Sequence, residues 1–154
     1  MAQSAVPIST RARVTILASQ FNEPISRALV RGARKVLRQA GVPVSRIRVV
    51  WVPGAFELPV VAAKLAASAR HPDAIIAVGA LIRGQTSQYE VIAHAVAQGL
   101  SQVAVSATIP VAFGVVVAEN AAQAHARAGG AMGNRGAEAA LAALAVLRLF
   151  EETG

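Results

Sequence analysis

The sequence predicts an α/β fold in which helices cover both faces of a parallel sheet. Short runs of β-branched and aliphatic residues alternate with longer, alanine-rich segments along the 154 residues. The short runs are apolar throughout, which is typical of strands that are buried on both faces. The length is that of one domain, so we expect a single domain over residues 1–154, with residues 1–12 as an extended N-terminal segment.

Each element has its own signal. The first helix ends at Gln39 because Gly41 stops it, and the second helix tolerates Pro59 in its first turn. A glycine-rich linker at 129–134 separates the last two helices. The expected strands are 14–17, 47–52, 74–79 and 111–117, and the expected helices end at 39, 69, 99, 128 and 151.

The composition narrows the possible functions. The chain is 55% hydrophobic and only 15% charged, which excludes a disordered or solvating segment and predicts extensive burial between subunits. There is no cysteine, and the three histidines lack the spacing of metal ligands, so we expect no metal site. The N-terminus has no apolar signal region, and the expected location is the cytoplasm.

The net charge of +7 favours an anionic partner. The first helix carries much of this charge as one stripe. A solvated helix face is the favoured interpretation, and a polyanion surface is the alternative. No aromatic residues interleave to stack bases, so the sequence does not favour a nucleic-acid partner. The stripe is formed by Arg27, Arg31, Arg34, Lys35 and Arg38.

Ligands of open α/β sheets bind beyond the carboxyl ends of the strands. Three of the four phenylalanines, Phe21, Phe56 and Phe113, lie on or near the corresponding loops and the last strand. They could stack on a flat ligand, or they could fill the core. The expected loops are 21–22, 54–57, 83–88 and 119–120.

Three polar features near these loops each allow two interpretations. Residues 84–87 precede a helix and could hold a phosphate, or they could cap that helix. Arg127 could grip a phosphate, or it could sit near a helix C-terminus in favourable contact with the dipole. Glu57 could cap a helix or accept a hydrogen bond from a ligand N–H.

Several motifs carry a resemblance to a known family. They are Phe21-Asn22, Val52-Pro53-Gly54-Ala55-Phe56-Glu57-Leu58-Pro59, Gly79-Ala80-Leu81-Ile82-Arg83-Gly84-Gln85-Thr86, Pro110-Val111-Ala112-Phe113-Gly114, Glu119-Asn120 with Gln123-Ala124, Arg127-Ala128-Gly129 and Asn134-Arg135-Gly136. In order and spacing, they resemble the lumazine synthase family over residues 13–150. That family makes 6,7-dimethyl-8-ribityllumazine in riboflavin biosynthesis.

The resemblance implies a three-layer, flavodoxin-like subunit with a four-stranded parallel sheet. It also implies pentamers, often twelve of them in an icosahedral shell, with a site between adjacent subunits. We expect the shell here, because the linker at 129–134 is compact. The implied substrates are 5-amino-6-ribitylaminopyrimidinedione and 3,4-dihydroxy-2-butanone 4-phosphate. No metal or redox cofactor is implied.

The resemblance also assigns roles. Phe21 would stack on the pyrimidine, and Arg127, from the neighbouring subunit, would meet the phosphate. Arg135 stands where the family usually has lysine and keeps the charge. The implied substrate-binding residues are Phe21, Asn22, Ala55, Phe56, Glu57, Ala80, Leu81, Ile82, Gln85, Thr86, Phe113, Arg127 and Arg135, with Phe113 also from the neighbour.

The chain departs from the family just after the expected phosphate loop. Gln88, Tyr89 and Glu90 stand where the family has a histidine, an aromatic residue and an aspartate. The histidine is the family's proposed proton shuttle, and glutamine cannot transfer a proton. Two hypotheses follow. The chain is a synthase in which Gln88 orients and Arg127 supports catalysis, or it is a paralogue acting as a shell, a flavin- or lumazine-binding protein, or an enzyme for a related amine and carbonyl.

Overall fold

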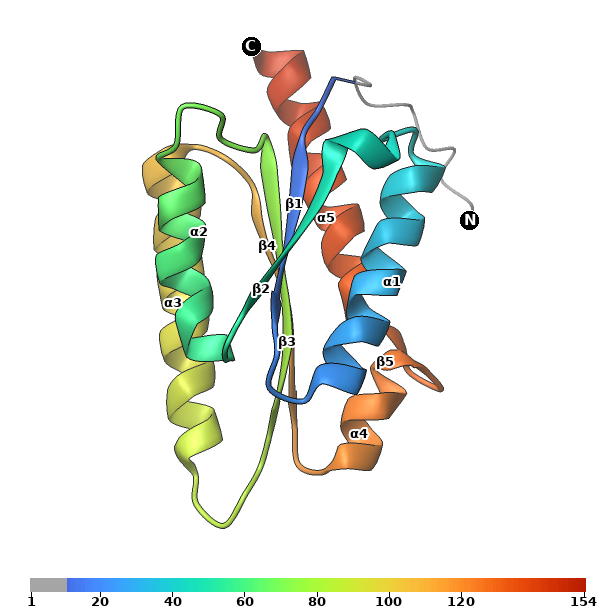
Figure 1. The fold of residues 1–154 in the computed structure, drawn as a ribbon, viewed down its shortest axis with the longest axis vertical. Helices are drawn as coiled ribbons and strands as arrows, with labels where there is room; N and C mark the ends of the chain where they lie inside the picture. Colours follow the sequence, from blue (N-terminus) through green and yellow to red (C-terminus); the bar gives the residue numbers. More distant parts are fainter. Residues whose placement is uncertain (1–10) are drawn as a thin grey trace.

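A four-stranded parallel sheet runs through the middle of the computed structural model, which describes residues 11–154 (Figure 1). The strands lie in the order β2-β1-β3-β4. In the register, Leu17 pairs with Ala77 and Ala77 pairs with Phe113. The strands are β1 (Val14–Ser19), β2 (Ile47–Val52), β3 (Ala74–Ile82) and β4 (Val111–Ala118).

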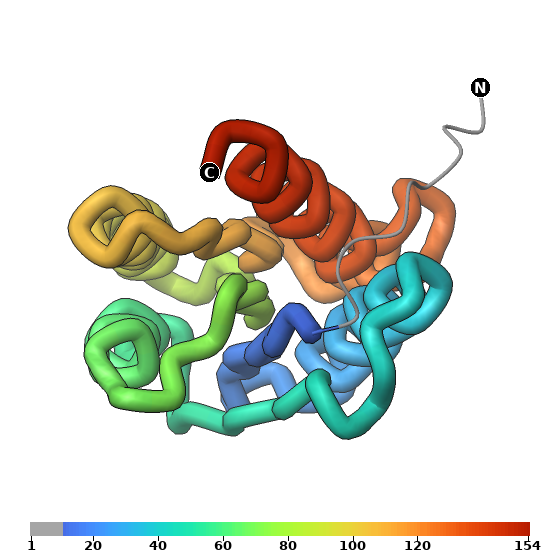
Figure 2. The backbone as a smooth tube through the Cα atoms, turned by 90° about the horizontal axis from the view of Figure 1, so that it is seen from above, coloured from blue at the N-terminus to red at the C-terminus, as the bar shows by residue number. Residues whose placement is uncertain are grey.

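Helices cover both faces of this sheet. The helices are α1 (Glu23–Gln39), α2 (Leu58–Ala66), α3 (Gln88–Ala107), α4 (Ala121–Ala126) and α5 (Arg135–Thr153), with short 3-10 turns at Val44–Arg46 and Ala55–Glu57. Figure 1 shows α2 and α3 on one face and α1, α4 and α5 on the other, and Figure 2 shows the same two layers from above. The predicted fold class is therefore confirmed. Of the expected N-terminal segment 1–12, residues 1–10 lie outside the described part of the chain.

The core consists of two apolar clusters, one on each face of the sheet. Ile16 and Ile76 pack with α1 and α5, whereas Leu17 and Ile75 pack with α2 and α3. Successive side chains of a strand point to opposite faces, and here both faces are covered. This explains why the strands read as continuous apolar runs rather than as alternating patterns.

Glycines allow the helices to approach one another closely. A Cβ at Gly136 would collide with the Leu29 backbone of α1, and one at Gly99 would lie 2.8 Å from Pro59 of α2. Asn134 strengthens the first of these contacts, because its side chain accepts from Ala137 N at 3.0 Å and donates to Ala28 O at 3.0 Å. These close contacts fix the position of α5 against α1 and of α3 against α2.

The structure differs from the expected elements at several points: the strand expected to end at 79 continues to Ile82, and the helix expected to end at 128 ends at Ala126. The helix expected to end at 99 continues to Ala107, and the one expected to reach 69 ends at Ala66. The linker 129–134 contains an antiparallel pair, β5 (Ala128–Gly130) with β6 (Gly133–Asn134). Gly129 and Gly133 have φ values of 102° and 83°, which favour glycine. Among residues 11–154, no helix is long and apolar enough to cross a membrane.

Candidate active site

The carboxyl ends of the four strands lie together at the lower end of the molecule in Figure 1. Hydrogen bonds join the loops that follow the strands. Phe21 N donates to Pro53 O at 3.1 Å, and Arg83 N donates to Ala118 O at 2.9 Å. The side chain of Asn22 donates to Ala80 O at 3.0 Å. Residues from distant parts of the sequence therefore form one edge, as the parallel topology predicts.

Two exposed aromatic rings stand on this edge. Phe21 is 70% exposed and Phe56 is 65% exposed, in a chain with only 4% aromatic residues. Exposed rings of this size are available for stacking on a flat ligand. Phe113 differs, because it pairs with Ala77 near the start of β4 and packs, half-buried, against the core of the α2–α3 face. Phe113 therefore lies on the last strand, as expected, and within one chain it fits the alternative of core filling, while its role in a neighbour's site stays a prediction.

The segment before α2 offers backbone and a carboxylate to the edge. Ala55 is buried in the 3-10 turn, and Glu57 N donates to Gly54 O at 3.2 Å. Glu57 occupies the N-cap position of α2, but its side chain makes no capping hydrogen bond. The structure therefore does not support the interpretation of Glu57 as a helix cap.

The end of β3 is largely core. Ala80 is 1% exposed and Leu81 is 9% exposed, so their side chains face the interior. Only Ile82 is partly exposed, where the strand passes into the loop. Of these three positions, Ile82 is the one whose side chain a bound molecule could readily touch.

The loop 83–87 is exposed and leads directly into α3. A Cβ at Gly84 would meet no atom within 4 Å, so this stretch is open on the outside. The Thr86 hydroxyl accepts from Gln88 N at a long 3.4 Å, and the N-cap Ser87 makes no side-chain capping bond. The first N–H groups of a 20-residue helix therefore point toward this open loop, the arrangement in which helices bind anions.

Gln88 begins α3 and is exposed. His94 is also exposed on α3, six residues further along, which places it about 9 Å farther up the helix axis and on another side. His94 therefore does not take the position that the family histidine would have.

A network of polar contacts, which the sequence did not reveal, connects residues at both ends of the loop 83–87. Arg83 Nη1 lies 3.1 Å from Glu119 Oε2. The Tyr89 phenol oxygen lies 3.2 Å from Glu119 Oε1 and 3.2 Å from Glu90 Oε1, and its single proton can go to either. Glu119 thus links residues on both sides of the loop 84–87. The only sequence signal was that residues 83 and 119 each follow a strand.

These contacts shift two pKa values. Burial of the ring, followed by the carboxylates of Glu119 and Glu90, raises the pKa of Tyr89 above its ordinary value of 10.0. The hydrogen bond and charge of Glu119 raise the pKa of Arg83, which stays protonated at every accessible pH. The network therefore keeps a neutral phenol beside two carboxylates.

A second polar cluster lies at the start of α5, on the opposite face from α3. Arg127 Nη1 donates to Met132 O at 3.0 Å, and its Nη2 lies 3.1 Å from Glu138 Oε2. Arg135 Nη1 lies 3.1 Å from the same oxygen. One carboxylate thus balances two half-buried guanidinium groups, and a net positive charge remains. Of the two interpretations of Arg127, the helix-end position is correct, since it directly follows α4, and the phosphate role stays a prediction.

Among residues 11–154, no group of three His, Asp or Glu side chains could hold a metal ion.

Glu138 is the residue of the second cluster that the sequence analysis missed. Its spacing of three residues from Arg135 on a helix was the available signal.

Comparisons with known proteins agree with the motifs. Residues 11–151 match the family described as 6,7-dimethyl-8-ribityllumazine synthase. Proteins of that name are 39% identical in Leuconostoc mesenteroides (93% of this chain, 91% of the relative) and 44% identical in Gemmatimonas aurantiaca (96% and 90%). A third, from Stenotrophomonas maltophilia, is 48% identical over 92% of this chain and 90% of its own length.

Proposed function

Because the chain belongs to the 6,7-dimethyl-8-ribityllumazine synthase family, we propose that it is a working synthase of riboflavin biosynthesis. The substrates would be 5-amino-6-ribitylaminopyrimidinedione and 3,4-dihydroxy-2-butanone 4-phosphate. One observation carries the proposal. The hydrogen bond from Asn22 to Ala80 O holds the exposed ring of Phe21 on the same edge of the sheet as the open loop 83–87.

The two substrates would occupy different parts of this edge. Phe21 would stack on the pyrimidine, with residues 55–57 along its ribityl chain. The phosphate would lie at the N-terminus of α3 and receive hydrogen bonds from the backbone and hydroxyl groups of Gln85 and Thr86. Arg127 and Arg135 of a neighbouring subunit would supply positive charge opposite the phosphate. Phe113 of that subunit would complete the binding site.

The chemistry consists of amine addition to a ketone, phosphate elimination and ring closure. The substrates bring their own nucleophile and leaving group, so correct positioning can supply much of the acceleration. Gln88 would hold a substrate oxygen or a water by hydrogen bonds, and that water or the substrate phosphate would move the proton. A rate below that of histidine-bearing relatives is expected, since general acid–base catalysis contributes roughly 10²–10⁴-fold.

An assay of the purified protein with both substrates, followed by lumazine fluorescence, tests this proposal. We expect turnover above the uncatalysed background, and we expect Gln88→His to raise kcat by at least about tenfold. Gln98, which is also exposed and lies on the same helix, provides the matched control, and Gln98→His should leave kcat unchanged.

The paralogue hypothesis rests on Gln88 and Glu90 together, because they stand where the family has the histidine and its acidic neighbour. It predicts that the wild-type chain binds lumazine or flavin but forms no product above background. That outcome would overturn the synthase proposal, and product formation by Gln88→His would then locate the cause at this position.

We further propose that the chain assembles into pentamers and a shell of twelve pentamers. This is supported by the large apolar side chains that remain exposed on α2, α3 and α5, among them Val60, Val105 and Leu141. The cytoplasmic location stays a prediction.

A further inference from the structure

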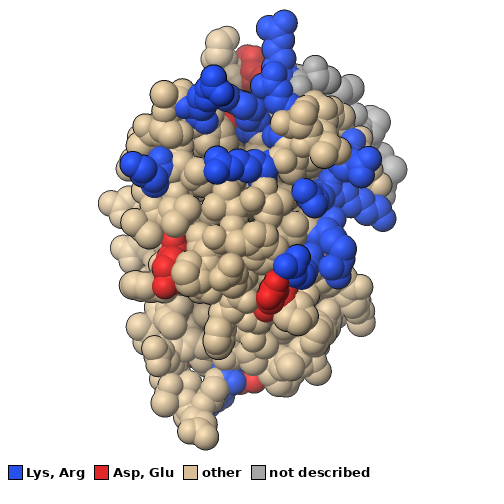
Figure 3. Space-filling view, viewed as in Figure 1, with Lys and Arg blue, Asp and Glu red and all other residues tan. Residues whose placement is uncertain are grey.

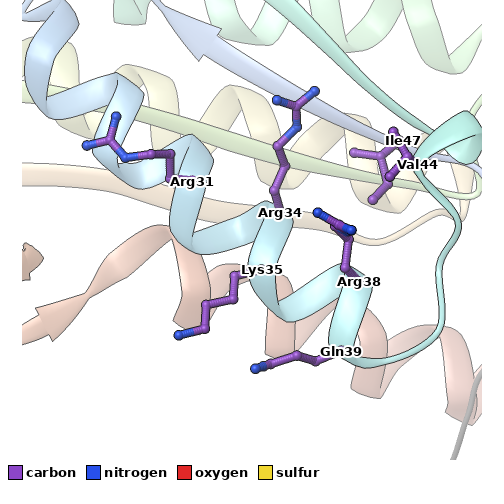
Figure 4. Close-up of a pocket in the computed structure, with 7 residues that line it drawn as sticks. All are labelled: Arg31, Arg34, Lys35, Arg38, Gln39, Val44 and Ile47. Atoms are coloured by element: carbon purple, nitrogen blue, oxygen red, sulfur yellow. The ribbon is translucent and has the colours of Figure 1, made fainter.

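A groove with a strongly positive lining lies between α1 and the segment that leads into β2. Its volume is about 610 Å³. Figure 4 shows Arg34 and Arg38 of α1 on the side of Val44 and Ile47, whereas Lys35 and Gln39 extend from the other side of the same helix. The residues that line it are Arg31, Arg34, Lys35, Arg38, Gln39, Val44 and Ile47.

The four cations of the groove carry a concentrated charge without a counter-charge. Among residues 11–154, no Asp or Glu lines the groove and no ion pair involves these four side chains. Arg27, on the preceding turn, differs because it pairs with Glu23 and lies 5.0 Å from the Trp51 ring. Figure 3 shows that Lys and Arg side chains spread over the upper half and right side of this view, around the end of α1.

The geometry suits a chain of phosphates. The cations recur over two helical turns, which span about 10 Å, so they can meet successive negative groups of an extended ligand. Guanidinium groups match phosphate oxygens in a bidentate manner. A single phosphate would engage only part of this row.

The lining also indicates what kind of partner fits. The cores of protein interfaces are depleted in charged residues, yet here four of seven lining residues are charged. A flat membrane surface cannot enter a groove. We therefore infer that the groove binds the phosphodiester backbone of a nucleic acid without sequence preference. The lack of aromatic residues excludes base stacking here, whereas contact with the backbone needs only cations.

Binding of a fluorescein-labelled oligouridylate to the assembled protein, measured by anisotropy from roughly 50 to 200 mM salt, tests the inference. For single strands the log–log salt slope is about −0.7 per phosphate contact, so Arg34→Gln/Arg38→Gln should make it shallower by about 1.4. Affinity at the lowest salt should fall roughly ten- to hundredfold.

Lys64→Gln/Arg70→Gln is the matched control, because it removes two exposed cations that do not line the groove. It should retain the wild-type affinity and slope. Equal losses in both double variants would mean that net charge alone attracts the RNA, and no binding at low salt would also overturn the inference. Complete displacement by pyrophosphate at equal phosphate concentration would assign the groove to short phosphate chains instead.

RNA binding in the groove is independent of the synthase activity. Light scattering should show the wild-type mass for both variants, and their lumazine formation should equal that of the wild-type chain. Failure of RNA binding with intact turnover would overturn the groove inference and leave the proposed function standing.

Discussion

At the scale of single residues, Tyr89 reports directly on the network around the loop 83–87. It is the only tyrosine of the chain, so phenolate absorption follows this group alone. Burial and the carboxylates of Glu119 and Glu90 raise its pKa, so we expect the titration midpoint above the ordinary 10.0. Glu119→Gln removes a charge and should lower the midpoint.

The sign of the stability effect follows from the same shift. The folded state holds the phenolic proton more tightly than the unfolded state, so this contribution is fully present below pH 10.0 and is lost as the pH rises through the folded pKa. Glu23→Gln, which breaks a carboxylate–arginine pair away from the network, should leave the midpoint unchanged. An unshifted midpoint in Glu119→Gln would contradict the network.

At the scale of elements, Asn134 joins α5 to α1. Its substitution by alanine removes the cap of a 19-residue helix and also removes the side-chain donor that the partly buried Ala28 carbonyl accepts in addition to its bond within α1. We expect the free energy of unfolding to fall by about 2–3 kcal/mol, measured by urea denaturation.

Asn120→Ala is the matched control for this prediction. It removes the same kind of cap, at 2.8 Å, from the six-residue helix α4, whose cap is exposed and reaches no other helix. The expected loss is about 1 kcal/mol. Equal losses for the two variants would show that the link to α1 adds nothing.

At the scale of the whole molecule, the exposed apolar surface predicts association. Val105 is 78% exposed and lines a hollow of about 440 Å³ between the end of α3 and α5. Val105→Glu would place a charge on this surface and should shift the particle mass, measured by light scattering, toward 15.8 kDa.

Val44→Glu is the control, since Val44 is also exposed, at 58%, but lies in the positively charged groove beside α1. It should keep the wild-type mass. A wild-type particle near the mass of a single chain would contradict association, and one near five chains would refute the shell but not the pentamer.

The sequence predicts those parts of the candidate site that depend on local pattern. The loops after the strands and the motif residues Phe21, Asn22 and Phe56 were expected on one edge, and they lie there. The contacts of Tyr89 with Glu119 and of Arg127 with Glu138 were not foreseen. Each joins residues whose approach depends on how separate elements pack, which local pattern does not encode.

Local sequence patterns are enough to predict the order and type of the main elements, because apolar runs, Gly41 and Pro59 act on their immediate neighbours. The end of α3 depends on packing between helices, because Gly99, which is unfavourable in an isolated helix, lets Pro59 of α2 pack closely. The hairpin at 128–134 and the groove beside the cations of α1 likewise depend on packing. Strand order and helix packing set these features, because they bring together residues that are far apart in the chain.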